Sequence, residues 1–233
     1  MLLNIVFSFV NINIKRLKLK ITKRKVSSEK EWQTMNKYLW AFIYLATLLW
    51  SAIAPKDYLT WFLEVLPAVI GAVILLFTYY SFRLTPLLYV LILLHCVILM
   101  IGGHYTYAEV PLFDTIKDIF NLDRNNYDKV GHFAQGFVPA ILAREILIRK
   151  QVVNGKTWLN TFIISICLAF SAFYELIEWW VAILSGENAE AFLGTQGYIW
   201  DTQSDMAIAL VGAICAIVFL AKYHDKQLNS AIS

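Results

Sequence analysis

Long apolar runs separated by short polar segments make up most of the chain from residue 37 onward. Runs of about 17 to 25 predominantly apolar residues are long enough to cross the hydrocarbon core of a bilayer as a helix. Six such runs lie near 37–54, 63–80, 84–101, 129–149, 158–184 and 205–222. The pattern therefore predicts an all-α, polytopic membrane helix bundle with six transmembrane helices.

Composition supports the same fold class. Hydrophobic residues make up 59% of the chain and charged residues only 16%, and the mean hydropathy is +0.58. A soluble domain of this size is far less apolar. We expect the lipid bilayer as the partner and no nucleic acid, and the sequence gives no indication of the oligomeric state.

Basic residues are unevenly divided between the two sides that six helices would define. With the N-terminus inside, all but four of the 20 Lys and Arg residues face the cytoplasm, and the exceptions are Lys56, Lys117, Arg124 and Lys129. Cytoplasmic segments of membrane proteins carry such an excess of Lys and Arg. We therefore expect both termini in the cytoplasm.

The predicted spans divide the chain into three parts. These are a basic cytoplasmic N-terminal tail (1–36), a six-helix transmembrane domain (37–223) and a cytoplasmic C-terminal tail (224–233). The basic cluster at 15–20 follows apolar residues, which is the reverse of the order in a cleavable signal peptide. We expect the N-terminal tail to lie near anionic lipid headgroups, and a translation start at Met35 is the alternative interpretation.

The longest external loop contains a short amphipathic segment. Phe113, Ile116 and Phe120 recur at helical spacing after Pro111. This spacing predicts a helix over residues 111–120 that lies on the outer surface of the membrane.

Polar side chains interrupt the last three predicted spans near their outer ends, at spacings that place them on one face of each helix. They are Asp128, His132 and Gln135 in the fourth span, Ser171, Glu175 and Glu178 in the fifth, and Asp201 and Asp205 at the start of the sixth. With a rise of about 1.5 Å per residue, all of them fall in the outer part of the bilayer. We predict a single carboxylate-rich pocket open to the extracytoplasmic side, in which His132, Glu175 and Asp205 form a triangle.

Carboxylates buried together need a neutralising partner, because desolvation and like charges disfavour their ionised forms. The partner could be a divalent cation, shared protons, or Lys129 and Arg124 folding over the mouth of the pocket. An oxygen-rich set with one or two imidazoles, the second from His104, favours Mg²⁺, Mn²⁺ or Ca²⁺. The candidate metal ligands are Asp128, His132, Glu175, Glu178, Asp201 and Asp205.

The same residues can be assigned catalytic roles in an enzyme that acts on a lipid-linked or envelope substrate. Glu175 or Glu178 would be the general base, and His132 with the aspartates would hold a metal ion, or phosphate through that ion. The chain has no Walker loop, GxSxG, HExxH or CxxCH motif, so the common ATPase, hydrolase, protease and haem chemistries have no support. The sequence shows no organic-cofactor motif.

Other interpretations of the polar residues stay open. Glu178, Asp201 and Asp205 could cap helix ends in water, Asp128 is a natural helix N-cap, and His132 could be a core histidine. A hydrogen-bond network joining three helices would make the protein a non-catalytic envelope factor. A transporter would need a polar route through the whole bilayer, and the acids in the outer part alone do not provide one.

Four motifs occur in order at residues 103–111, 128–133 (Asp-Lys-x-x-His-Phe), 174–179 and 197–206. Together they resemble the YjdF-type family of bacterial inner-membrane proteins over residues 37–223. The resemblance implies a multi-pass protein of the bacterial inner membrane, in a family whose function is unknown. The second and third motifs with Asp205 are also similar to VanZ-like proteins, except that Trp179 stands near where a glutamine is expected.

Overall fold

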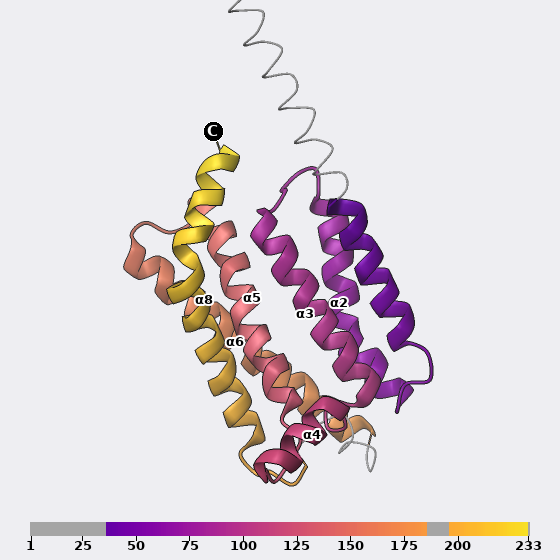
Figure 1. Ribbon diagram of the computed structural model, residues 1–233. Helices are drawn as coiled ribbons and strands as arrows, with labels where there is room; N and C mark the ends of the chain where they lie inside the picture. The colour runs from indigo at the N-terminus through magenta and orange to yellow at the C-terminus, as the bar shows by residue number, and fades with distance from the viewer. Residues whose placement is uncertain (1–35, 186–195, 233) are drawn as a thin grey trace, which may run out of the picture. The chain divides into compact units, whose positions relative to one another are not determined.

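The computed structural model describes residues 36–185 and 196–232 of the chain. All regular structure within these ranges is helical (Figure 1). The chain separates into two compact units, Met1–Ala46 and Thr47–Ser233. A helix at 36–51 begins in the first unit, and every contact described below belongs to the second. The predicted N-terminal tail lies outside the described residues, apart from residue 36.

Apolar helices form the second unit. They are α2 (Tyr58–Thr78), α3 (Pro86–Tyr105), α4 (Pro111–Phe120), α5 (Tyr127–Arg149), α6 (Lys156–Ser185) and α8 (Asp201–Ile232). In the described part of the chain, α2, α3, α6 and α8 are long and apolar enough to cross a membrane. The predicted all-α membrane fold is confirmed at this level, whereas the count of six spans and the location of the termini stay predictions.

Local sequence explains where several helices begin. The Asp57 carboxylate accepts a hydrogen bond of 2.7 Å from the backbone N–H of Thr60 at the start of α2, and this bond lowers the pKa of Asp57. Pro86 and Pro111 occupy the first turns of α3 and α4, where a missing N–H costs nothing. Negative charge and proline therefore mark helix starts here as they do in soluble proteins.

The short helix predicted at 111–120 is confirmed as α4. Phe113 packs edge-on against Tyr127, with ring centroids 5.2 Å apart, and Ile116 is half-buried. Phe120 is exposed, so only the first part of the predicted apolar face contacts the rest of the protein.

The backbones of α5 and α8 touch each other. A methyl group placed on Gly136 would lie 1.8 Å from the backbone oxygen of Ala209, and one on Gly212 would lie 2.2 Å from the backbone oxygen of Phe133. Glycine is needed at both positions because any side chain would separate the helices. This contact fixes the register between α5 and α8, which carry two of the three predicted polar stripes.

A second polar cluster ties α3, α5 and α8 together near the C-terminal end of α5. The fully buried carboxylate of Glu145 accepts hydrogen bonds from Thr85 Oγ1 (2.8 Å) and Arg149 Nη1 (2.7 Å) and contacts His224 Nε2 at 2.9 Å. Sequence analysis missed this cluster. His224 belongs to the segment predicted as the cytoplasmic C-terminal tail (224–233), where α8 continues to Ile232, and its side chain is completely buried.

Candidate functional site

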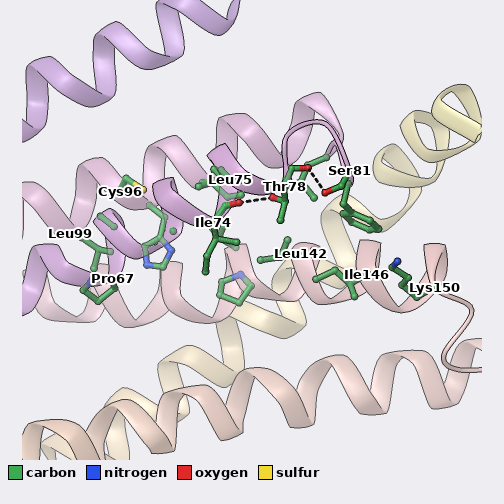
Figure 2. Close-up of a pocket in the computed structure, with 18 residues that line it drawn as sticks. Pro67, Ile74, Leu75, Thr78, Ser81, Cys96, Leu99, Leu142, Ile146 and Lys150 are labelled. Atoms are coloured by element: carbon green, nitrogen blue, oxygen red, sulfur yellow. Dashed lines mark hydrogen bonds between the residues drawn. The ribbon is translucent and has the colours of Figure 1, made fainter.

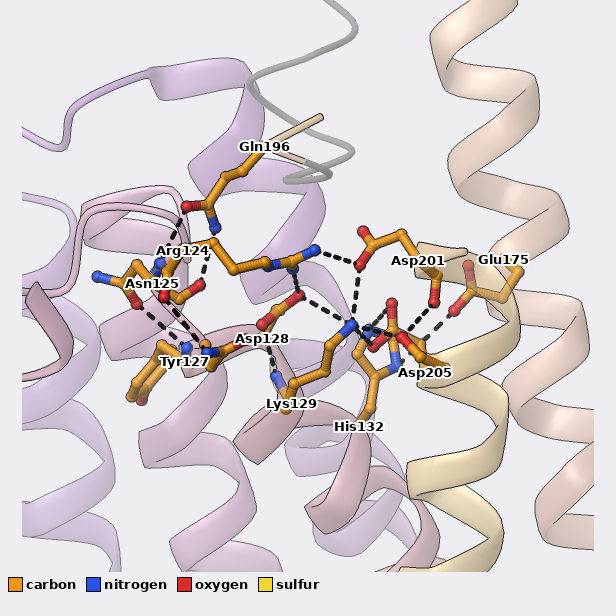
Figure 3. A network of polar contacts seen from close by, with 12 residues as sticks. Arg124, Asn125, Tyr127, Asp128, Lys129, His132, Glu175, Gln196, Asp201 and Asp205 are labelled. Carbon is orange, nitrogen blue, oxygen red and sulfur yellow. Dashed lines mark hydrogen bonds and ion pairs between the residues drawn. The ribbon is translucent and has the colours of Figure 1, made fainter. Parts of the chain in front are cut away.

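The three polar stripes meet where the N-terminal parts of α5 and α8 approach α6. His132 Nδ1 lies 3.8 Å from Glu175 Oε1, and His132 Nε2 lies 3.7 Å from Asp205 Oδ2 (Figure 3). The predicted triangle of His132, Glu175 and Asp205 is thus confirmed as geometry. Its members come from three different helices. They can meet because the polar residues lie at similar depth along each helix.

The triangle offers one ligand atom from each of its three residues, and only one of the two ring nitrogens of His132 can bind a given ion. Separations of 3.7 and 3.8 Å are too long for hydrogen bonds. Two ligands bound to one divalent cation at about 2.1 to 2.4 Å lie roughly 3 to 4 Å apart. One ligand atom from each of the three residues can be chosen so that all lie within 4.8 Å of one another. The triangle can therefore hold a divalent cation after small side-chain movements.

Glu175 supplies the clearest sign that the triangle lacks a partner. Its side chain is 6% exposed, and its Oε1 atom accepts no hydrogen bond from any residue in the described ranges. Leaving a buried carboxylate oxygen without a partner costs free energy. A bound cation or a proton at this oxygen would remove that cost.

Gln135 orients the imidazole of the triangle. Its Oε1 atom lies 3.1 Å from His132 Nδ1, so a neutral His132 that donates from Nδ1 keeps the lone pair of Nε2 directed toward Asp205. Metal-bound histidines characteristically donate their other N–H to an oxygen in this way. Gln135, which belongs to the predicted stripe, is therefore a positioning residue for His132.

Two cations neutralise the outer part of the cluster. Arg124 pairs with Asp128 and, at 2.7 Å, with Asp201. Lys129 Nζ lies 2.8 Å from Asp201 Oδ1 and 2.6 Å from Asp205 Oδ1. The sequence predicts three ways to neutralise the buried carboxylates. One of them, Arg124 and Lys129 folding over the mouth of the pocket, is confirmed for Asp128 and Asp201.

The six candidate ligands consequently fall into an outer group beside Arg124 and Lys129 and an inner group at the triangle. Asp128 and Asp201 bind Arg124 and Lys129, so their charge is already compensated. Asp205 belongs to both groups, because its Oδ1 atom faces Lys129 and its Oδ2 atom faces His132. Asp128, Asp201 and Asp205 also lie close enough together for an ion, but the cations occupy that position.

Two further carboxylates are buried beside the triangle. Glu178 follows Glu175 by one helical turn, is 8% exposed, and lines the same groove as His132 and Asp205. Glu64 of α2 is 6% exposed and accepts a hydrogen bond of 3.0 Å from Tyr174 Oη. Sequence analysis missed Glu64. The available signal was the position of Glu64 as the only acid in the apolar α2 segment.

Loop residues cover the cation pairs. The Gln196 side chain accepts from the backbone N–H of Asn125 (3.1 Å) and donates to its backbone oxygen (2.8 Å). The Tyr198 ring lies 5.6 Å from the guanidinium of Arg124 and 5.7 Å from Lys129 Nζ, within cation–π range. These contacts hold Arg124 and Lys129 in place, and sequence analysis did not identify them.

His104, the second imidazole expected as a ligand, lies elsewhere. His104 Nδ1 lies 3.0 Å from the backbone oxygen of Ser51, and its ring packs on Trp50, so His104 does not join the triangle. His95 lines an apolar part of the groove. His132 is thus the imidazole at the site.

Comparison with known proteins places the chain among membrane proteins. A family model described as "Predicted membrane protein (DUF2238)" matches residues 36–226. "Inner membrane protein YjdF" of Escherichia coli (strain K12) is 51% identical over 182 residues, which are 78% of this chain and 87% of the relative. The predicted resemblance to YjdF-type proteins is confirmed, and the likeness to VanZ-like proteins stays a prediction. No solved structure gives a significant match.

Proposed function

Because the chain belongs to the DUF2238 family of predicted membrane proteins, we propose that it acts in the bacterial inner membrane as a metal-dependent enzyme. Its substrate is a lipid-linked or envelope molecule, and its centre is the triangle of His132, Glu175 and Asp205. The location is supported by the relative, which is an inner membrane protein. The distribution of Lys and Arg supports six spans, cytoplasmic termini and an extracytoplasmic site.

One observation carries the metal assignment. Glu175 Oε1 is buried without a hydrogen bond from any described residue, and one ligand atom each from Glu175, His132 and Asp205 can be chosen within 4.8 Å of the others. Buried polar atoms are nearly always paired, so a partner is expected at this oxygen. A divalent cation satisfies Glu175, His132 and Asp205 together.

The charge balance of the site also calls for a cation. The cluster combines the carboxylic acids Asp128, Glu175, Glu178, Asp201 and Asp205 with only two permanent cations, Arg124 and Lys129. In a largely water-excluded site, uncompensated negative charge is costly. One divalent ion would compensate part of the excess.

His132, Glu175 and Asp205 would hold the ion, which would supply Lewis-acid chemistry at the site. Such chemistry would include a lowered pKa of water and polarisation of a phosphoryl or carbonyl oxygen of the substrate. Glu178, one turn beyond Glu175 and outside the triangle, would be the general base of such an enzyme. Lys129 donates to Asp201, Ser204 and Asp205, and its charge also favours an anionic group of the substrate at the edge of the site.

Thermal unfolding of the purified protein in detergent tests the metal site. After treatment with a chelator, addition of Mn²⁺, Mg²⁺ or Ca²⁺ at about 100 times its Kd should stabilise the protein by about 2.7 kcal/mol. The Glu175→Gln variant should lose most of this stabilisation while keeping its fold. Glu109→Gln is the matched control, since Glu109 is exposed in a surface pair with Lys56, and it should respond to metal as the native protein does.

Two results would contradict the metal site. One is a native protein that no divalent cation stabilises, and the other is a Glu175→Gln variant that responds as strongly as the native protein. In either case the polar cluster would be explained as a structural joint of a non-catalytic envelope factor, with Arg124 and Lys129 as its cations.

A further inference from the structure

A long groove runs between α2 on one side and α5 and α6 on the other. Its part nearest the triangle has a volume of about 720 Å³. A second part of about 580 Å³ shares Gly71, Leu99 and Pro139 with the first and continues toward Ser81 and Lys150 (Figure 2). The two parts adjoin along α2 and α5, and the part nearest the triangle is also lined by α6.

The groove begins at the candidate site. Glu64, His132, Glu178 and Asp205 all line its first part. At this end the hydrogen bond from Tyr174 Oη to Glu64 joins α6 to α2, so the two walls are linked beside the site. A ligand that fills the first part of the groove would therefore have one end at the triangle.

Beyond the site the walls are apolar. Side chains of α2 such as Ile70 and Ile74 line one wall, and side chains of α6 such as Ile166 and Phe170 line the other. Ile70, Ile74 and Phe170 are 49%, 55% and 61% exposed. In a membrane protein, such side chains on spanning helices face hydrocarbon. The groove is thus open sideways to the tails of the bilayer lipids.

The length of the groove exceeds one leaflet. Along α5, the lining residues run from His132 to Ile146, which is about 21 Å at 1.5 Å per residue. Half of a hydrocarbon core of about 30 Å is roughly 15 Å. A chain that starts at the site and follows the groove would therefore pass the middle of the bilayer.

From this geometry we propose that the groove binds the hydrocarbon chain of a lipid phosphate, with the phosphate at the metal triangle and the chain running past Ile146. The inference rests on the proposed function for the phosphate end, where a divalent ion and Lys129 provide the positive charge. The apolar walls hold a hydrocarbon chain, and they offer no path along which a polar head group could cross the bilayer.

Photolabelling tests the proposal with a polyprenyl phosphate that carries a photoreactive group at the end of its chain. In proteoliposomes with Mn²⁺, labelling should be saturable and should fall on peptides around Ile74 and Ile146. Unlabelled polyprenyl phosphate should compete, and inorganic phosphate should not.

Two tryptophan variants of α2 make the test specific to the groove. Nothing lies within 4 Å of a methyl group placed on Gly71, so Gly71→Trp can fill the groove without disturbing the helix. It should reduce labelling by about tenfold. Leu76→Trp introduces the same residue at an exposed position of α2 that does not line the groove, and its labelling should match that of the native protein.

The proposal fails if Gly71→Trp labels as well as the native protein, if the label spreads over all lipid-facing residues, or if inorganic phosphate displaces the probe. It also fails if two copies of the chain cross-link through Ile74 and Phe170, because a second copy would then cover the groove. Labelling that survives chelation and the Glu175→Gln change would support chain binding in the groove and contradict the metal function. Metal-dependent stabilisation without labelling of the groove would support the metal function and contradict chain binding in the groove.

Discussion

His132 Nε2 and Asp205 Oδ2 lie 3.7 Å apart across the interface between α5 and α8. One turn beyond His132, the backbone of Gly136 rests against the backbone of Ala209, one turn beyond Asp205. The separation between the imidazole and the carboxylate is therefore set by a backbone contact between two helices. A change at that contact should reach the site even though it touches neither side chain.

Replacement of Gly136 by alanine tests this relationship. The added methyl group would meet the backbone oxygen of Ala209, which cannot rotate away, so α5 and α8 must separate. We expect a loss of stability of roughly 1–3 kcal/mol, as for other overpacked positions, together with a smaller metal-dependent shift of Tm.

Gly71→Ala is the matched control, because it places the same methyl group in a helix where nothing lies within 4 Å. It should leave the metal response unchanged and raise the stability by up to about 1 kcal/mol through the better helix propensity of alanine. Equal behaviour of the two variants would contradict the role of the Gly136 contact.

The ion pairs between Lys129 and the aspartates lead to a second prediction. Lys129→Met removes the ammonium group that lies within 2.8 Å of both Asp201 and Asp205. Because the Lys129 side chain is only 17% exposed, we expect the free energy of unfolding to fall by roughly 1.5–3 kcal/mol, the range for hydrogen bonds to charged groups. Denaturant or thermal unfolding in detergent measures this loss.

The control for Lys129→Met is Lys56→Met. Lys56 forms an exposed pair with Glu109, and pairs of this kind contribute little to stability. An equal loss of stability in both variants would mean that the Lys129 contacts have no special role in holding α8 against α5.

Periodicity explains how much of the site could be predicted. Polar residues at i, i+4 and i+7 in apolar helices fix a face, and that face sufficed to bring His132, Glu175 and Asp205 together. The division of the acids into two groups could not be predicted, because it depends on where the loop carries Arg124. Spacing within one helix says nothing about such contacts.

Two polar features escaped sequence analysis for a similar reason. Glu64 is a lone acid on α2, so no repeated spacing marked it, and its partner Tyr174 is 110 residues away. The contact between Glu145 and His224 joins helices 79 residues apart. His224 follows the last strongly apolar stretch, so hydropathy alone ended the span before the residue that α8 buries.

The topology is a third prediction. The basic residues place both termini in the cytoplasm and the triangle on the outer side. Green fluorescent protein fused after Lys226 should fluoresce, and alkaline phosphatase at the same position should be inactive. Alkaline phosphatase inserted after Glu109 should be active. An active phosphatase after Lys226 would contradict the orientation of the site.

The metal triangle is tested most directly by pulsed electron spin resonance of Mn²⁺ bound to the purified protein. Direct coordination by His132 predicts hyperfine coupling to an imidazole nitrogen in the native protein. The coupling should disappear in His132→Gln and persist in His104→Gln, because the His104 ring packs on Trp50 away from the triangle. Bound Mn²⁺ without nitrogen coupling in the native protein, or coupling that survives in His132→Gln, would contradict the proposed site.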